Sequence, residues 1–294
     1  MDNMFTYKYG RANLATDLVV IAFHEGKLLV LIKWNDHLDG YTLPGKIMHC
    51  SSVPGNEFGS GNWTLEETVR QSLIIEGGGT KNPKDVTIDL TEYLKYKNGP
   101  WPIQLDARSD IERDHRYRCV TIPYLVLVGS EAVKKLPRKN DFEWVELSQI
   151  EGVEMGKTIE TPDALETTLE RRKISNESIK TTEAKELYTL KLDHIDILNH
   201  AIERIRFVAS LIPIGREILP DTFTMSDLQR LYEAVFCSDG TTFDRVAFQK
   251  LMLKRKHLCP AGEKPSHGKA ARLYSFDDEV YDYYVATHSF YFKS

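Results

Sequence analysis

The sequence predicts an α+β protein with two domains: a mixed β-sheet with helices packed on it, followed by a smaller helical domain that ends in a β-ribbon. Three observations predict this class. A chain of 294 residues is long for one domain and short for three. Over residues 1–150, strand patterns surround one capped helix, an order that does not suit a doubly wound parallel sheet. From residue 191 the apolar spacing becomes helical. We therefore expect domains at 1–150 and 191–294, joined by a segment at 151–190.

Each predicted element of the first domain has its own pattern. Two apolar runs around the His24-Glu25-Gly26 turn predict a β-hairpin. Thr64, with Glu67 three residues later, has the spacing of a capping box and predicts a helix as far as Glu76, where glycines end it. The predicted elements are strands at 18–23, 27–33, 40–45, 86–94, 119–128 and 142–145, the helix at 64–76, and a polar loop at 49–62.

The next segment, residues 151–188, changes in character. It has many Glu, Lys and Thr residues and few large apolar side chains. Thr161-Pro162-Asp163 has the order of an N-cap with proline in the first helical position. We interpret the segment as a helical insertion or connector, and the alternative is a solvated surface excursion.

The last part of the chain has the pattern of a small helical domain. Apolar residues from Ile195 to Val208 predict a helix that starts near Lys191. Thr224, with Asp227 at the third position, predicts the cap of a second helix. A short helix at about 244–256 and a basic ribbon at 258–274 follow. Helix, turn, helix and ribbon is the order of a winged helix.

Composition and charge exclude several broad classes of protein. Hydrophobic residues make up 41% of the chain and aromatic residues 10%, which excludes global disorder. No apolar stretch approaches the roughly 20 residues that a membrane span needs, and the N-terminus lacks the regions of a signal peptide. The four cysteines form no CxxC pair, which indicates free thiols in a reducing cytoplasm. We expect a cytoplasmic protein that does not bind membranes.

Charge is distributed unevenly along the chain. The net charge of −5 argues against general polyanion binding. Residues 240–275, however, hold eight Lys or Arg against two Asp or Glu, a local charge of +6, so that the rest of the chain carries about −11. A small basic element on an acidic body is therefore expected.

The Leu43-Pro44-Gly45 turn, followed by the capped helix that ends at Glu76-Gly77-Gly78, resembles the Nudix family. That resemblance implies a mixed-sheet α/β/α sandwich. In the family, clustered carboxylates on the helix hold Mg²⁺ or Mn²⁺ against a pyrophosphate, and such cations need several oxygen ligands.

The family's charged residues are mostly replaced in this chain. Aligned on the turn and on the helix end, the first glycine of the family signature becomes Lys46 and its first glutamate becomes Trp63. Its Arg-Glu pair becomes Gln71-Ser72, and its Glu-Glu pair becomes Ile75-Glu76. A single carboxylate cannot assemble the metal site, so we expect no catalytic residue, no bound metal and no cofactor.

Zinc is a further possibility for the last domain, which contains ligand-type side chains. The spacings between them match no common zinc site, and Cys237 follows an apolar helix end, where a thiol is usually buried. We therefore predict no zinc. The side chains in question are Cys237, His257, Cys259 and His267.

A cluster of charged residues precedes the long apolar strand at 119–128. The run Arg113-Asp114-His115-Arg116-Tyr117-Arg118 offers paired donors and acceptors that suit phosphates, carboxylates or sugar hydroxyls. The alternative is a solvated loop with an Arg–Asp surface pair. We predict a ligand site formed by Arg113, Asp114, Arg116, Lys46 and Glu76.

Motifs in both domains, in their order along the chain, resemble the Nudix-related transcriptional regulators. In the C-terminal domain these motifs are the segments 192–198, 201–206, 219–235, 244–250 and 268–274. The resemblance covers residues 12–150 and 190–276. It implies a bacterial repressor of NAD or pentose metabolism, a small effector that is either ADP-ribose-like or a pentose, and a homodimer on paired half-sites of operator DNA. The missing helix carboxylates tip the prediction slightly toward a sugar.

The predicted DNA-binding residues lie on the two helices and the ribbon of the last domain. Arg and Gln suit guanine and adenine edges in the major groove, and basic residues of the ribbon suit phosphates. The residues are Ser226, Gln229, Arg245, Gln249, Lys250 and Lys254 on the helices and Lys264, Lys269 and Arg272 on the ribbon. Two alternatives stay open: a divergent Nudix hydrolase acting on a nucleoside diphosphate derivative, and a sensor that binds a protein partner through residues 151–188.

Overall fold

The N-terminal part of the chain is built on one mixed sheet. The computed structural model describes residues 12–48, 63–76, 87–94, 102–136, 141–154, 171–173, 187–237, 241–265 and 270–288. The strands of the main sheet are β1 (Asn13–His24), β2 (Lys27–Asn35), β3 (Gly40–Thr42), β4 (Gly45–Ile47), β7 (Ile103–Gln104), β8 (Cys119–Thr121), β9 (Tyr124–Val128) and β10 (Phe142–Glu146). They run in the order β10-β2-β1-β9-β7, with β3 paired to β2 and with β4 and β8 paired to β1.

Strand β1 lies at the centre of this sheet. Its residues 15–23 are all buried, which is the pattern of a strand covered on both faces. It pairs antiparallel with β2 and parallel with β9, so the predicted mixed sheet is confirmed. The β1–β2 hairpin turns at Glu25 and Gly26, whose φ angles of 50° and 83° are those that a two-residue type I′ turn requires.

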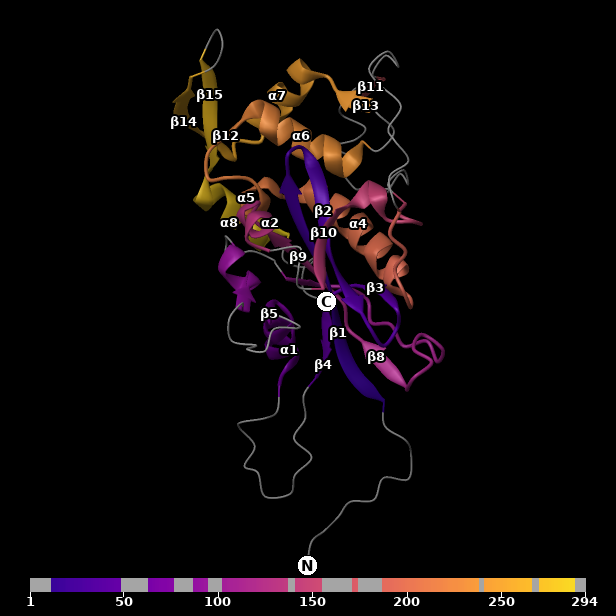
Figure 1. The fold of residues 1–294 in the computed structure, drawn as a ribbon. Helices are drawn as coiled ribbons and strands as arrows, with labels where there is room; N and C mark the ends of the chain where they lie inside the picture. Colours follow the sequence, from indigo (N-terminus) through magenta and orange to yellow (C-terminus); the bar gives the residue numbers. More distant parts are fainter. Residues whose placement is uncertain are drawn as a thin grey trace, which may run out of the picture.

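Side chains that alternate along β1 pack against two layers of helices. On one face they join a core cluster with α4 (His194–Leu211). On the other face they pack with α1 (Leu65–Ser72) and α2 (Glu131–Lys135). Figure 1 shows α4 and α1 on different sides of the sheet. The predicted α/β/α sandwich is therefore confirmed.

The predicted helix at 64–76 is shorter in the structure. Thr64 caps it as predicted, but α1 ends at Ser72. Residues Ile74–Glu76 instead form β5, which pairs antiparallel with β6 (Thr87–Asp89). Two consecutive β-branched isoleucines are compatible with an extended backbone, and the pairing with β6 ends the helix early. The prediction that Glu76 lies on the helix was wrong.

Two predicted strands are also interrupted. Of the strand predicted at 86–94, the described residues 87–94 form β6 and then a 3₁₀ turn, η2 (Leu90–Tyr93), which starts where the Asp89 carboxylate accepts the Thr91 N–H. The strand predicted at 119–128 is divided into β8 and β9 at Pro123, which has no N–H to donate to a sheet. A second 3₁₀ turn, η3 (Leu147–Gln149), follows β10.

The C-terminal part has the predicted helices and ribbon. Thr224 and Asp227 form the predicted capping box, and the predicted inward face of the helix that they cap is buried. The elements are α5 (Gly215–Ile218), β12 (Phe223–Thr224), α6 (Met225–Phe236), β13 (Thr241–Phe243), α7 (Arg245–Lys254), β14 (Leu258–Lys264), β15 (Ala271–Phe276) and α8 (Asp278–Thr287). Strands β12, β15 and β14 form one sheet, so the winged-helix prediction is confirmed. No sequence pattern had indicated α8.

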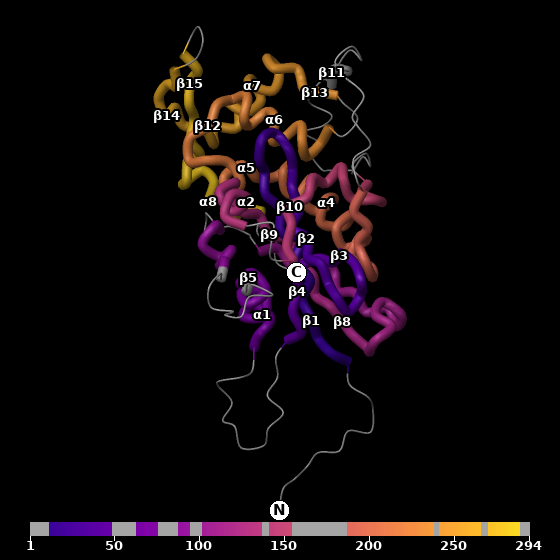
Figure 2. The backbone as a smooth tube through the Cα atoms, in the orientation of Figure 1, coloured from indigo at the N-terminus to yellow at the C-terminus, as the bar shows by residue number. Residues whose placement is uncertain are grey.

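The two parts contact each other through α4 and through the β1–β2 hairpin. The hairpin reaches α6 in both ribbon and tube (Figure 1, Figure 2). On α4, the Arg206 guanidinium donates to the Val235 carbonyl near the end of α6, with an N···O distance of 2.9 Å. One hydrophobic cluster runs from the sheet through α4 to α6. The predicted domain boundary at residue 191 stays a prediction.

Only a little of the segment predicted as a connector is described. Strand β11 (Arg171–Lys173) pairs with β13 of the C-terminal part. The helix predicted near residue 161 and the polar loop at 49–62 lie outside the described residues. Within the described ranges, no helix has the length and apolar character that crossing a bilayer requires.

Candidate functional site

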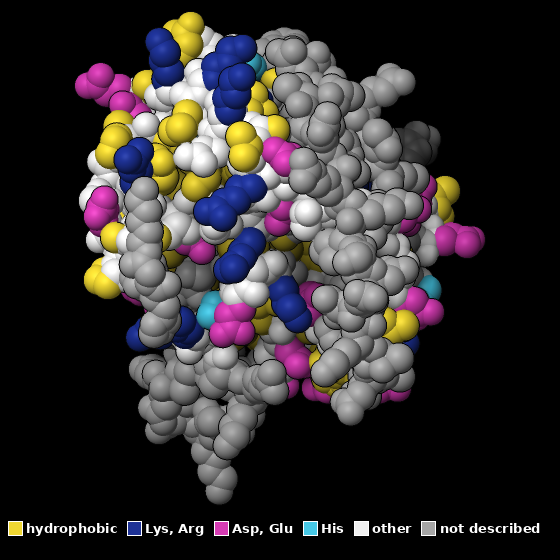
Figure 3. Space-filling view, turned by 90° about the horizontal axis from the view of Figure 1, so that it is seen from above, with side chains coloured by type: hydrophobic (Ala, Val, Ile, Leu, Met, Phe, Trp, Pro, Cys, Tyr) yellow, Lys and Arg dark blue, Asp and Glu magenta, His cyan; other side chains and the backbone are white. Residues whose placement is uncertain are grey.

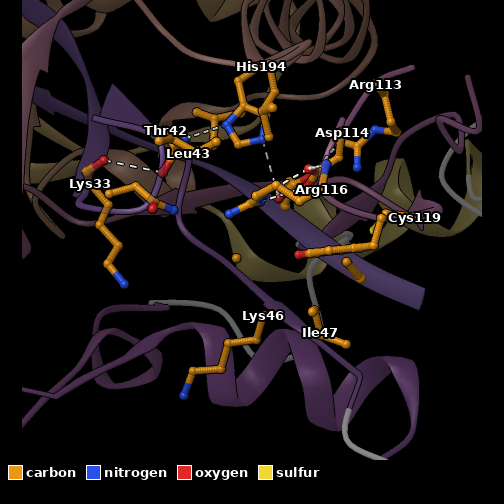
Figure 4. Close-up of a pocket in the computed structure, with 17 residues that line it drawn as sticks. Lys33, Thr42, Leu43, Lys46, Ile47, Arg113, Asp114, Arg116, Cys119 and His194 are labelled. Atoms are coloured by element: carbon orange, nitrogen blue, oxygen red, sulfur yellow. Dashed lines mark hydrogen bonds and ion pairs between the residues drawn. The ribbon is translucent and has the colours of Figure 1, made fainter. Parts of the chain in front are cut away.

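A pocket of about 180 Å³ opens beside β1, and four of the five predicted ligand residues line it (Figure 4). Lys46 comes from β4, and Arg113, Asp114 and Arg116 come from the loop before β8. The fifth residue, Glu76, lies on β5, and its side chain is outside the described part of the structure, so its place in the site stays a prediction. The structure thus brings together the charged loop and the turn that carried the Nudix resemblance.

Arg113 is a buried residue of the pocket wall that links two carboxylates of the protein. Its side chain is 4% exposed and donates to two carboxylates. Asp193 is held bidentately, with N···O distances of 3.0 and 2.8 Å, and Asp17 on β1 is 3.2 Å away. Burial opposes the charge of Arg113, but the hydrogen bond to Asp193 and the charges of both carboxylates outweigh it and raise the pKa of the guanidinium.

Asp193 and its neighbours begin α4, so the pocket wall includes the first turn of that helix. His194 is buried, and its Nδ1 accepts the Leu43 N–H at 2.8 Å. The neutral imidazole then carries its proton on Nε2, which lies 3.7 Å from an Asp17 carboxylate oxygen. Burial lowers the pKa of His194, which keeps the ring neutral. Leu192, also in the pocket wall, has a φ of 60°, a strained conformation for a bulky side chain.

The other two arginines of the charged loop have different roles. Arg116 pairs bidentately with the buried Asp114, at 2.9 and 2.7 Å, and its own side chain is 28% exposed at the pocket rim. That hydrogen bond lowers the pKa of Asp114. Arg118 is exposed and donates to the Ser109 and Asp110 carbonyls. The three arginines of the predicted cluster therefore differ: Arg113 is buried between two carboxylates, Arg116 forms an ion pair at the pocket rim, and Arg118 holds the loop through backbone carbonyls.

Two lysines line the side of the pocket opposite Arg113 and Asp114 (Figure 4). The Lys33 ammonium lies 5.4 Å from the centre of the Phe142 ring, and that of Lys46 lies 5.9 Å from the centre of the Trp63 ring. Among the described residues, neither lysine forms an ion pair. These two positive charges are therefore available to an anionic ligand.

Sequence reasoning missed several polar residues of this site, among them two aspartates, a lysine and a histidine. Asp17, Lys33, Asp193 and His194 lie on β1, on β2 and at the start of α4. Asp193 is 80 residues and Asp17 is 96 residues from Arg113 along the chain. Among these four, only Asp193 and His194 belong to a motif that the sequence analysis singles out, the segment 192–198, and there the motif is taken as part of the C-terminal domain.

The second candidate surface is the outer face of the winged helix. Seen from above, this face shows Lys and Arg side chains with hydrophobic side chains between them (Figure 3). Arg245, Lys250 and Lys254 are exposed on α7, whose opposite face buries Phe248 and Met252. A groove of about 590 Å³ lies between α7 and the ribbon.

The predicted DNA-binding residues do not all lie on this face. Ser226, Arg245, Gln249 and Arg272 line the groove, and Lys264 is exposed on β14. The Gln229 amide instead donates within the domain, to Glu233 at 2.8 Å and to the Phe243 carbonyl at 3.0 Å. Lys269, like His267, lies outside the described residues.

Comparison with protein families and curated proteins agrees with this architecture. Residues 215–276 match a family model described as the NrtR DNA-binding winged helix domain. A curated relative, the ADPR responsive transcriptional repressor NtrR of Acinetobacter baylyi, is 22% identical over 188 residues. That alignment spans 63% of this chain and 60% of the relative's length.

Comparison with solved structures covers more of the chain. Shewanella oneidensis NrtR, crystallised with a 27mer DNA, is similar over 91% of this chain and 94% of that one, with 19% identity and a TM-score of 0.55. A MutT/nudix family protein from Enterococcus faecalis is similar over 93% of this chain and 90% of that one, with 18% identity and a TM-score of 0.50. The chain therefore combines the fold of the Nudix-related NrtR proteins with an NrtR-type winged helix domain, and the predicted resemblance to the Nudix-related transcriptional regulators is confirmed.

Proposed function

We propose that this chain is a transcriptional repressor that binds operator DNA through its winged helix and responds to a small effector in its Nudix-like domain. The observation that carries the proposal is the basic outer face of α7 and the ribbon on a chain that is acidic elsewhere. The printed name of the Acinetobacter relative, an ADPR responsive repressor, and the DNA complex of the Shewanella protein support it.

The proposed DNA interface consists of α7 and the ribbon. Arg245 and Gln249 have the side chains that read guanine and adenine, and they stand at the N-terminal half of α7, the part of a recognition helix that meets base edges. Lys264 and Arg272 on the ribbon are placed to contact phosphates. Gln229 is left out, because its amide is already bonded inside the domain. We further propose a homodimer, since winged helices commonly occupy paired half-sites.

The proposed effector is a ribose phosphate compound of the ADP-ribose kind rather than a free pentose. Lys33 and Lys46 offer positive charge to a phosphate, whereas a neutral sugar needs none. The described cavity, at about 180 Å³, is smaller than the roughly 300–1,000 Å³ typical of pockets for larger ligands. We therefore expect it to hold one phosphate-bearing end of the effector.

The proposed coupling between the two sites runs through α4. Arg113 contacts both the pocket and Asp193 at the start of α4, and Arg206 near the other end of α4 is bonded to α6. A ligand that changes the partners of Arg113 would bias the position of α4 and so of the winged helix. Coupling of this kind typically changes affinity by about 5–150-fold.

We propose that the Nudix-like domain does not hydrolyse its ligand. Gln71 and Ser72 replace a charged pair of the Nudix signature, and the Glu67 carboxylate is held by Arg70 and by the Gln71 amide at 2.7 to 2.9 Å. Because α1 ends at Ser72, the one remaining signature glutamate of the helix end lies on a strand.

One experiment tests these proposals together. Duplexes selected by the full chain from a random library would be titrated by gel shift, with ADP-ribose, arabinose or inorganic phosphate added. We expect ADP-ribose alone to change DNA affinity, and a Lys33→Gln, Lys46→Gln variant to bind DNA normally without that response. Failure to enrich any duplex would refute DNA binding. Breakdown of ADP-ribose with Mg²⁺ present would support the hydrolase instead, and light scattering would report the oligomeric state.

A further inference from the structure

The exposed face of α7 is not uniformly basic. Val246, Gln249, Lys250 and Leu253 have the i, i+3, i+4, i+7 spacing that places side chains on one helical face. Val246 is 73% exposed and Leu253 is 43% exposed. The face that we propose to enter the major groove therefore carries apolar groups among the polar and basic ones (Figure 3).

The place of Val246 sets it apart from an ordinary exposed hydrophobic residue. It stands in the first turn of α7, where the Asp244 carboxylate accepts the Val246 and Ala247 N–H groups at 3.1 and 2.9 Å and fixes the start of the helix. Valine is a weak helix former, so its presence at an exposed helical position brings no local stability. Its branched side chain has one strongly preferred rotamer in a helix, so little entropy is lost when it meets a surface.

We propose, as an extension of the DNA-binding function above, that Val246 contacts the 5-methyl group of a thymine and so sets the base preference at that position. The N-terminal residues of a recognition helix meet base edges, and the thymine methyl is the apolar group that the four bases present in the major groove. Arg245 precedes Val246, and Lys250 lies one turn along the same face. These charges favour a polyanion over an apolar protein surface as the partner.

Replacing thymine by uracil in the duplex tests the contact directly, because uracil lacks only the methyl group. The full chain would first select its preferred duplexes from a random library. Single thymines in a selected duplex would then be replaced by deoxyuridine, and affinity measured by fluorescence anisotropy. Burying one methyl-sized group corresponds to about a fourfold change in affinity. We expect a loss of about that size at one thymine of each half-site, and a smaller loss at that position for Val246→Ala, which keeps only the Cβ.

Leu253→Ala provides the matched control, because it removes exposed apolar surface about 10 Å further along the same helix. That variant should keep the thymine preference. Equal binding of both duplexes by the unmodified chain would overturn the proposal while leaving the DNA-binding function intact. A preference of unchanged size in Val246→Ala would also overturn it. If no duplex is selected at all, the proposed function fails and this contact fails with it. Chains that associate through Val246 without DNA would instead make this face an interface between copies.

Discussion

Replacing Arg113 with methionine should destabilise the N-terminal part strongly. The guanidinium is 4% exposed and faces two carboxylates, Asp17 at 12% and Asp193 at 15% exposure. Without the arginine, both negative charges lose their partner in a poorly solvated place. Removing one partner of a buried ion pair costs about 3–5 kcal/mol. Since whole domains have about 5–15 kcal/mol of stability, we expect a large fall in the urea midpoint.

Urea unfolding followed by tryptophan fluorescence would measure the change. Asp193→Asn alone should cost less than Arg113→Met, because Arg113 keeps Asp17 at 3.2 Å. The two changes together should cost less than their sum, by about 0.5–3 kcal/mol, because one stranded charge has been removed. Arg118→Met is the matched control in the same loop. Among the described residues, its exposed guanidinium bonds to the Ser109 and Asp110 carbonyls alone, so the change should cost about 1 kcal/mol or less.

Two results would refute this reasoning. A loss below about 1 kcal/mol for Arg113→Met would mean that water replaces the guanidinium around Asp17 and Asp193. Additive effects of Arg113→Met and Asp193→Asn, within about 0.3–0.5 kcal/mol, would mean that the two side chains act independently.

Three further expectations concern the turn, the acid response and the DNA face. A Cβ on Gly45 would clash with the Thr16 backbone carbonyl on β1, so Gly45→Ala should lower stability by about 1–3 kcal/mol in a thermal melt. A Cβ on Gly40 has the flexible Lys191 side chain as its nearest described neighbour, so Gly40→Ala should stay within about 1 kcal/mol. Burial lowers the pKa of His257 from 6.5 to about 3. The free energy of unfolding should therefore fall by about 1.4 kcal/mol per pH unit as the pH falls from 6.5 toward 3. An unchanged urea midpoint between pH 7 and pH 5 would contradict this. Arg245→Ala and Lys250→Ala should each weaken binding of a selected duplex by about 1–3 kcal/mol where they read a base; unchanged gel-shift affinity with a normal melting temperature would remove α7 from the interface.

Features that depend on neighbouring residues could be predicted from the sequence. The β1–β2 hairpin follows from two apolar runs and a glycine-containing turn, and the capping box of α6 follows from Thr224 and Asp227. The length of α1 could not be predicted in the same way. Its last predicted turn is extended because Ile74–Glu76 finds a partner strand at Thr87–Asp89, more than ten residues away. Pairing with a distant strand overrides local helix signals.

The same distinction applies to the candidate pocket. Arg113, Asp114 and Arg116 were predicted because charged residues are dense beside an apolar strand, and the structure places all three in the pocket wall. The different partners of these three residues could not be predicted, because Arg113 bonds to Asp17 and Asp193, which come from distant parts of the chain. A guanidinium that the sequence offered to a ligand is in fact held by two carboxylates of the protein.

This arrangement bears on how the proposed effector could control DNA binding. A ligand can shift an equilibrium only by the difference between its affinities for the two states. A phosphate held by Lys33 and Lys46 alone would leave the Arg113–Asp193 pair intact, and so would not distinguish two positions of α4. A ligand group that reaches Arg113 would compete with Asp193 for the guanidinium and release the first turn of α4, next to the strained Leu192. Two compounds of equal affinity should therefore differ in their effect on DNA binding, according to whether they reach Arg113.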